Sequence, residues 1–85
     1  MTNKIIVYTT VPCVNCSTTK EMMKFHEIKF EEVATHNLDN SDDVIDMLRE
    51  KGFTQFPVIS VNDWEDSWCG FQPDRIENYS GKYNE

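Results

Sequence analysis

Residues 4–16 join a run of β-branched residues to a closely spaced cysteine pair, and they read Lys4-Ile5-Ile6-Val7-Tyr8-Thr9-Thr10-Val11-Pro12-Cys13-Val14-Asn15-Cys16. The run from Lys4 to Thr9 is typical of a buried strand in an α/β sheet. Pro12 ends this run, because proline cannot donate a hydrogen bond to a sheet and suits the first turn of a helix. Apolar side chains then recur at helical spacing from Cys16 to about His26. The sequence therefore predicts a strand followed directly by a helix.

The cysteine pair lies at the junction of these two elements. A helix N-terminus presents unpaired backbone amides and a partial positive charge, and both stabilise a thiolate. Cys13 precedes the helix and stays accessible, so we expect its pKa to lie below the value of about 8.5 for a free thiol. Cys13 is thus the expected nucleophile. Cys16, one turn along, is the expected resolving thiol, which attacks the mixed disulfide and leaves a Cys13–Cys16 bridge.

Zinc sites use the same cysteine spacing. Here only Cys69, His26 and His36 remain as further ligands, and none of them is paired at ligand spacing. We therefore expect no metal site and interpret both histidines as surface residues. A zinc-binding interaction module is kept as an alternative, and so is an adaptor domain whose cysteines are incidental.

Two further elements are predicted in the middle of the chain. Residues 28–33 alternate apolar and charged side chains, which favours a half-exposed strand near a sheet edge. A helix is expected to begin at Asn40 or Ser41, either of which can cap it through its side chain. Gly52 then supplies the left-handed residue that ends this helix.

A β-hairpin is predicted next. Its first strand opens at Pro57 and runs to Val61, and Asn62-Asp63 marks the turn. Its second strand runs from about Trp64 or Glu65 to Trp68, with Trp64 as an exposed hairpin residue.

The last predicted element is a helix that begins at Pro73, after a break at Gly70. Its side chains Ile76 and Tyr79 are expected to face the core, with Tyr83 trailing. The element order is therefore β-α-β-α-β-β-α, which predicts an α/β fold with a mixed sheet flanked by helices. At 85 residues the chain suits a single domain, residues 1–85.

Composition excludes several classes of function. The formal net charge of −7 repels phosphate backbones and anionic membranes, so we expect no nucleic acid and no membrane as partner. No apolar run approaches the roughly 20 residues of a membrane span, and the first residues carry no apolar signal segment. These features predict a cytoplasmic protein. In the cytoplasm standing disulfides are rare, so a close cysteine pair indicates catalysis or metal binding.

Phe56-Pro57-Val58 is a second group of candidate functional residues. A proline at the start of a buried strand is costly unless it has a role, and a cis peptide bond is one such role. Sequence alone does not distinguish this from a trans proline that opens an edge strand.

Several stretches together resemble the glutaredoxin-like NrdH redoxins of the thioredoxin superfamily, over nearly the whole chain. They are the first strand, the cysteine pair, Thr19-Lys20, the segment Gly52-Phe53-Thr54-Gln55-Phe56-Pro57-Val58-Ile59, and the segment Trp68-Cys69-Gly70-Phe71-Gln72-Pro73-Asp74.

The resemblance implies a thioredoxin fold with a four-stranded mixed sheet and three helices. It also implies a cis Pro57 beside the cysteines and a surface around Phe56, Pro57 and Val58 that binds an extended substrate segment. For a reductase it suggests Trp68, Gly70 and Phe71 as docking residues, with the core as the alternative place for Trp68 and Phe71.

Partners are implied in the same way. The resemblance points to a monomeric electron carrier that is reduced by thioredoxin reductase and reduces the disulfide of a class Ib ribonucleotide reductase. No cofactor is expected on the chain itself, since NADPH acts through the reductase.

A glutathione-dependent glutaredoxin is the alternative within the same fold. Such proteins usually carry Thr-Val-Pro before the strand and a Gly-Gly pair after the hairpin, whereas this chain has Gln55-Phe56-Pro57 and Trp68-Cys69-Gly70-Phe71. Cys69 departs from the family, which usually has serine there. It is either a small replacement for serine or a third reactive thiol.

Overall fold

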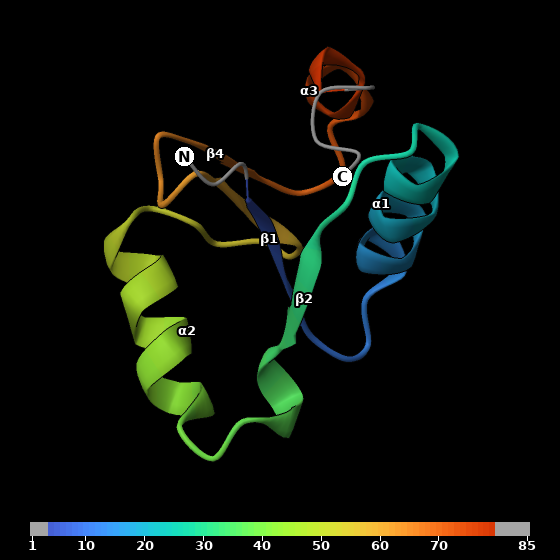
Figure 1. Ribbon diagram of the computed structural model, residues 1–85. Coiled ribbons are helices and arrows are strands. Elements are labelled where there is room, and N and C mark those ends of the chain that lie inside the picture. Colours follow the sequence, from blue (N-terminus) through green and yellow to red (C-terminus); the bar gives the residue numbers. More distant parts are fainter. Residues whose placement is uncertain (1–3, 80–85) are drawn as a thin grey trace.

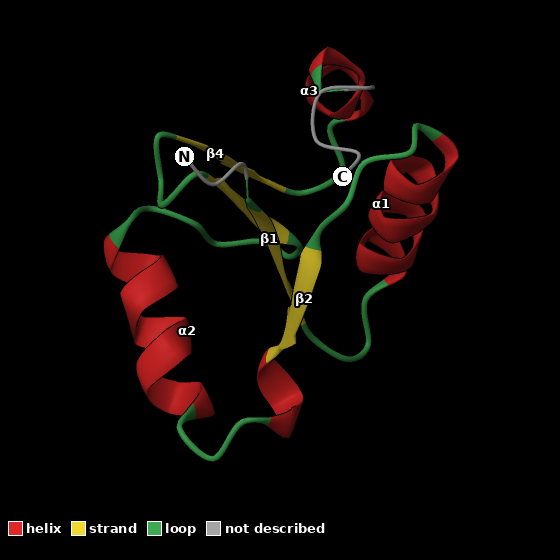
Figure 2. Ribbon diagram, in the orientation of Figure 1, coloured by secondary structure: helices red, strands yellow, loops and turns green. Residues whose placement is uncertain are grey.

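The computed structural model describes residues 4–79 of the chain. In this range the chain forms a four-stranded sheet, three α-helices and one 3-10 turn (Figures 1 and 2). The strands are β1 (Ile5–Thr9), β2 (Glu31–Ala34), β3 (Val58–Val61) and β4 (Asp66–Cys69). The helices are α1 (Val14–Phe25), α2 (Ser41–Glu50) and α3 (Pro73–Asn78), and the 3-10 turn is η1 (Thr35–Asn37).

The sheet has the strand order β2-β1-β3-β4. Strands β1 and β2 are parallel and are joined by α1, whereas β3 pairs antiparallel with both β1 and β4. Figure 1 shows α1 and α2 on opposite sides of the strands. The mixed sheet, the terminal hairpin and the place of β2 at an edge are confirmed.

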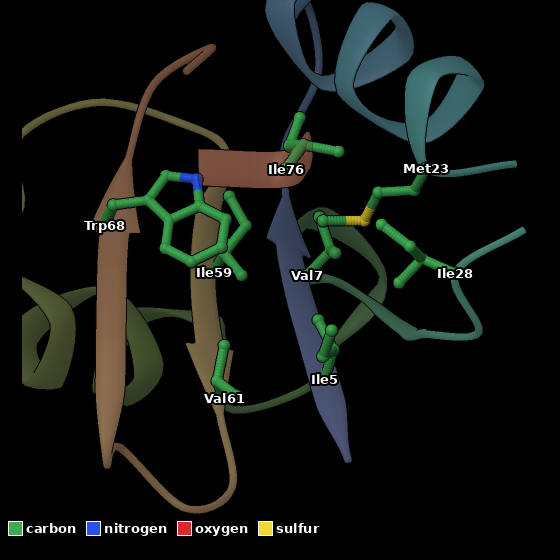
Figure 3. Close-up of a cluster of buried hydrophobic side chains, with 8 residues drawn as sticks. All are labelled: Ile5, Val7, Met23, Ile28, Ile59, Val61, Trp68 and Ile76. Carbon is green, nitrogen blue, oxygen red and sulfur yellow. The ribbon is translucent and has the colours of Figure 1, made fainter. Parts of the chain in front are cut away.

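The main core lies between the sheet and the two helices α1 and α3. Cross-strand partners Val7, Ile59 and Trp68 form its centre, while α1 contributes Met23 and α3 contributes Ile76 (Figure 3). The complete cluster comprises Ile5, Val7, Met23, Ile28, Ile59, Val61, Trp68 and Ile76. This packing holds the N-terminus of α1 beside the end of β1, where the cysteines lie.

Helix α2 ends as predicted at Gly52. This residue has φ +95°, and its N–H donates to the Arg49 carbonyl at 2.9 Å. The N–H of Phe53 donates to the Leu48 carbonyl at 3.0 Å, which completes a Schellman motif. At the other end Asn40 is the N-cap residue, but its side chain makes no capping hydrogen bond. The predicted position was right and the predicted side-chain cap was wrong.

The second strand begins later than predicted. Ile28 lies outside it and belongs to the turn that ends α1, where its N–H donates to the Met23 carbonyl at 2.8 Å. Glu27, at φ +58°, is the left-handed residue of this turn. Ile28 is apolar because it packs into the core after the helix, and β2 starts only at Glu31. Helix α1 itself begins at Val14, directly after Cys13, which confirms the predicted position of Cys13 before the helix.

The hairpin turn is longer than predicted and includes Trp64. Asn62, Asp63 and Trp64 have φ values of 49°, 57° and 72°, so β4 cannot begin until after them. Trp64 is not an exposed hairpin residue. Its ring stacks on Tyr8 at 5.8 Å and on Phe53 at 6.0 Å between centroids, and these contacts favour its left-handed backbone.

Helix α3 begins at Pro73, as predicted, and contacts the sheet through Ile76 and Tyr79. The hydroxyl of Tyr79 donates to Asp66 Oδ2 at 2.6 Å, and Arg75 pairs with Asp66 Oδ1 at 3.1 Å. The Tyr79 hydrogen bond is the main reason why the pKa of Asp66 lies below its usual value; partial burial opposes it, and smaller contributions from Ser67 and Arg75 lower the pKa further. Tyr83 lies outside the described residues.

Candidate active site at the start of helix α1

Cys13 and Cys16 form a disulfide at the N-terminus of α1, with their Cα atoms 5.3 Å apart. Cys13 is the N-cap residue and has extended backbone angles, so it lies just before the first helical turn. Its Sγ accepts a hydrogen bond from the backbone N–H of Cys16 at 3.0 Å. The structure therefore brings together the two cysteines predicted to react, in the oxidised state of the pair.

The two sulfurs differ in accessibility. Cys13 is half-buried, whereas only 3% of Cys16 is exposed. A substrate disulfide can therefore meet the sulfur of Cys13 from solvent. The sulfur of Cys16 is placed to react with a sulfur already joined to Cys13.

The electrostatics of this helix end favour a thiolate on Cys13. The first turn of α1 contains no acidic side chain, and its free amides carry the positive end of the helix dipole. The Cys16 N–H adds a direct hydrogen bond to the sulfur. A charged acceptor makes such a bond stronger, so this arrangement stabilises the reduced, deprotonated nucleophile.

Cys13 lies on an open hollow of about 460 Å³, called the Cys13 hollow below. It is lined by Thr10, Pro12, Cys13, Val14, Asn15, Gln55 and Phe56, none of which is charged. Its neighbourhood is also apolar, since Val11 is 63% exposed and Val14 is 81% exposed. Exposed apolar residues next to a reactive sulfur are typical of a surface that contacts another protein.

The loop before β3 forms the other side of the hollow. Phe56 lines it, and the Phe56–Pro57 peptide bond is cis, as the resemblance implied. Pro57 and Val58 are buried beneath, and the Pro57 carbonyl accepts a hydrogen bond from Gly70 at 2.8 Å. Of the three residues predicted to bind substrate, only Phe56 has a side chain at the hollow. Their binding role stays a prediction.

The predicted docking residues occupy different environments. Trp68 is 3% exposed and stacks on Tyr79 with 5.9 Å between ring centroids, so its side chain offers no surface to a partner. This burial corrects the expectation that Trp68 docks directly, because the residue belongs to the core. Gly70 is buried, while Phe71 packs on the core but stays half-exposed. Docking through Gly70 or Phe71 stays a prediction.

Cys69 is a free, half-buried thiol at the end of β4, opposite Val58. His26 lies edge-on to Phe25, and His36 is exposed in η1. Within residues 4–79, no three His, Cys, Asp or Glu side chains are grouped so that they could hold a metal ion. No helix in that range is both long and apolar enough to cross a membrane.

One polar network near the site was not anticipated. Glu32 Oε2 on β2 accepts hydrogen bonds from Lys20 Nζ at 3.0 Å and from Thr9 Oγ1 at 2.8 Å. The Lys20 hydrogen bond is the largest cause that lowers the pKa of Glu32, followed by the bond from Thr9. The network ties α1 to the end of β1, just before the cysteine loop. Its partners are far apart in sequence, so only the fold reveals it.

Gln55 and Thr10 also line the hollow, although neither was singled out as a site residue. Both could have been predicted from the sequence, because Thr10 follows the first strand and Gln55 precedes Phe56-Pro57, and both segments were already assigned to the site.

Comparisons with known proteins identify the family to which this chain belongs. The glutaredoxin family matches residues 5–64 of the chain. The glutaredoxin-like protein NrdH of Salmonella typhimurium is 43% identical over 72 residues, which are 85% of this chain and 83% of that protein. The NrdH protein of Lactococcus lactis subsp. lactis is 31% identical over 72 residues, 85% of this chain and 93% of that protein.

Solved structures agree with these relatives. NrdH-redoxin from Escherichia coli, a glutaredoxin-like protein with a thioredoxin-like activity profile, superimposes with a TM-score of 0.77 at 33% identity, covering 88% of this chain and 92% of that one. Methanoredoxin from Methanosarcina acetivorans also has a TM-score of 0.77, at 27% identity over 92% of this chain and 84% of its own. This chain therefore belongs to the glutaredoxin family and, within it, to the NrdH-type thiol–disulfide oxidoreductases, with Cys13 and Cys16 as its redox-active pair.

Proposed function

We propose that this chain is an electron carrier that is reduced by thioredoxin reductase and in turn reduces the disulfide of a class Ib ribonucleotide reductase. The observation that carries the proposal is the Cys13 hollow, where an accessible sulfur lies beside exposed apolar residues and uncharged lining residues. Such a surface suits a protein segment better than a small charged thiol. We place this carrier in the cytoplasm as a monomer, with no cofactor of its own.

The chemistry follows from the arrangement of the two sulfurs. In the reduced protein the Cys13 thiolate attacks one sulfur of the substrate disulfide, which forms a mixed disulfide and releases the first substrate thiolate. Cys16 then loses its proton and attacks Cys13 Sγ. The second substrate thiolate leaves and takes up a proton, so two electrons have moved to the substrate and the Cys13–Cys16 disulfide has formed.

Recharging the carrier runs the same exchange with a reductase dithiol as the attacking group. The first reductase thiolate attacks the accessible sulfur of Cys13, and Cys16 leaves as a thiolate and takes up a proton. The second reductase thiolate then attacks the reductase sulfur of this mixed disulfide, which releases the Cys13 thiolate and leaves the reductase with a disulfide. NADPH supplies the two electrons through the reductase. In this proposal the backbone at Phe56 pairs with an extended segment of the partner, in the manner of an added strand.

Glutathione as reductant is the second candidate, and the match to the glutaredoxin family favours it. Glutathione carries two carboxylates and one ammonium group. No lining residue of the Cys13 hollow is a lysine, an arginine or an acidic residue that would pair with these charges. This contrast supports thioredoxin reductase as the electron donor.

The test is disulfide reduction by the purified protein with two reducing systems. One contains NADPH and thioredoxin reductase, and the other contains NADPH, glutathione and glutathione reductase, with NADPH oxidation as the readout and insulin as the acceptor. We expect activity with thioredoxin reductase, its loss in Cys13→Ser, and its retention in the matched control Cys69→Ser. Activity with glutathione alone would transfer the chain to the glutathione-dependent class.

The acceptor is tested separately with a class Ib ribonucleotide reductase. NADPH and thioredoxin reductase should support deoxyribonucleotide formation only when this chain is added. Equal formation with the Cys13→Ser variant would contradict the proposed role.

A further inference from the structure

Gln55 is a polar residue at the Cys13 hollow that the mechanism above does not use. It lies between the end of α2 and the cis Phe56–Pro57 bond, and it lines the hollow together with Cys13 and Phe56. The residue is exposed, and within residues 4–79 its carboxamide has no hydrogen-bond partner. Gln55 therefore brings a primary amide with unused donors and acceptors to the border of the hollow where a substrate must approach.

The position of this carboxamide depends on Gly70. A Cβ atom built on Gly70 would lie 2.9 Å from Gln55 Oε1 and 4.0 Å from its Cδ, so a side chain at residue 70 would push the carboxamide out of its present position. Gly70 is also tied to the same loop, because its N–H donates to the Pro57 carbonyl at 2.8 Å. The absence of a side chain at Gly70 thus lets Gln55 lie against the β4 end of the site.

The chemistry of a carboxamide indicates what it would bind. It offers N–H donors and a carbonyl acceptor, which is the same pair of groups that a peptide unit presents in complementary form. The rest of the hollow is uncharged, so no neighbouring ion competes for the amide or selects a charged ligand. The matching ligand is therefore the backbone of a polypeptide next to its own cysteine.

We propose that Gln55 is a specificity-determining residue for polypeptide disulfides, and that its carboxamide hydrogen-bonds a peptide group flanking the substrate cysteine while Cys13 attacks. Gly70 is the positioning residue that makes room for this carboxamide. The inference deepens the proposed function and rests on it for the class of substrate. It adds no step to the exchange, since the bonds broken and formed are those of the Cys13 reaction.

The experiment uses protein that has been reduced chemically and freed of reductant, so its outcome does not depend on which reductase recharges the chain. Rate constants are measured with insulin, whose disulfides are flanked by peptide groups, and with bis(2-hydroxyethyl) disulfide, which has none. The readout is the ratio of the two rate constants. A merely structural role for Gln55 would slow both reactions alike and leave this ratio unchanged.

For Gln55→Leu we expect the ratio to fall about three- to tenfold, which corresponds to one net hydrogen bond. Gln72→Leu is the matched control, because Gln72 is the other glutamine of the chain and donates to the Cys69 carbonyl outside the hollow. Its ratio should equal that of the wild type. Gly70→Ala should lower the ratio like Gln55→Leu, and each variant is assayed below its unfolding temperature.

An unchanged ratio in Gln55→Leu, or an equal fall in Gln72→Leu, would overturn the proposal. An unchanged ratio in folded Gly70→Ala would overturn the role of Gly70. A lack of activity with thioredoxin reductase would contradict the proposed electron donor but would not change these ratios. The two experiments therefore test the proposed function and the role of Gln55 separately.

Discussion

Ile76→Ala is expected to remove most of the attachment of α3 to the sheet. Ile76 is fully buried and belongs to the same core cluster as Trp68 and Met23 (Figure 3). The change deletes about three methylene equivalents at about 0.8 kcal/mol each, so the loss of transfer free energy alone is about 2.4 kcal/mol. The cavity left behind raises the total to about 3–4 kcal/mol, within the usual range for this substitution.

That loss is large for this chain. A domain of 85 residues has a free energy of unfolding of about 4–13 kcal/mol, so the substitution removes from about a quarter to nearly all of it. Urea unfolding, followed by circular dichroism, measures the effect. With a slope of about 1–1.5 kcal/mol per molar urea for so small a chain, the midpoint should fall by about 2–4 M.

Phe25→Ala is the matched control for the loss of a large apolar side chain. Phe25 is 81% exposed at the end of α1, and its ring contact is an edge-on one with His26. Its substitution should change the free energy of unfolding by no more than about 0.5 kcal/mol. If Ile76→Ala costs less than about 1 kcal/mol, or no more than Phe25→Ala, then α3 is not packed as part of the core and the reasoning is refuted.

Three further predictions concern a turn, an acidic group and the cysteines. Glu27→Gly should raise the unfolding temperature by about 2–8 °C, because relief of about 1–2 kcal/mol of left-handed strain at φ +58° exceeds the entropy cost of a glycine; a lower temperature in calorimetry would contradict this. Asp66 has a folded-state pKa below its usual value of 3.8, so its contribution to stability is present above about pH 3.8 and is lost as the pH falls through the folded pKa. Urea unfolding of Asp66→Asn should therefore show a deficit against wild type near neutral pH that shrinks below pH 3.8, and a deficit that grows on acidification would refute the assignment. Cys16→Ser should retain a mixed disulfide with insulin and Cys13→Ser should not, as judged by the mass of the protein under non-reducing conditions; the reverse pattern would exchange the roles of the two thiols.

Local rules predicted those elements whose boundaries are set by neighbouring residues. Gly52 ends α2 because glycine, which has no Cβ, adopts the left-handed conformation without steric cost. Pro73 starts α3 because the N–H that proline lacks is not needed in the first helical turn. The position of Cys13 before a helix followed from the same kind of rule. In each of these cases the residue type itself determines the local backbone, so distant contacts were not required.

The predictions from sequence were wrong where the same residue pattern is compatible with two different local structures. Apolar residues at 28 and 30 fit a strand, but Ile28 packs as the hydrophobic residue after the Schellman turn of α1. Trp64 fits the start of a strand by propensity, yet stacking on Tyr8 and Phe53 holds it in the turn. Both outcomes depend on tertiary contacts. The Gln55–Gly70 contact is of the same kind and was equally invisible in the sequence.

The three cysteines of the chain show that position sets the chemistry of a thiol in this fold. Cys13 is half-buried at a helix N-terminus with an amide donating to its sulfur, and Cys16 is buried one turn further along but within covalent reach of it. Cys69 is also half-buried, but it lies at the end of β4, where its backbone pairs with that of Val58, and not at the start of a helix. Exposure alone would therefore not distinguish the reactivity of Cys13 from that of Cys69. The helix N-terminus separates them, because it stabilises the charged form that attacks a disulfide.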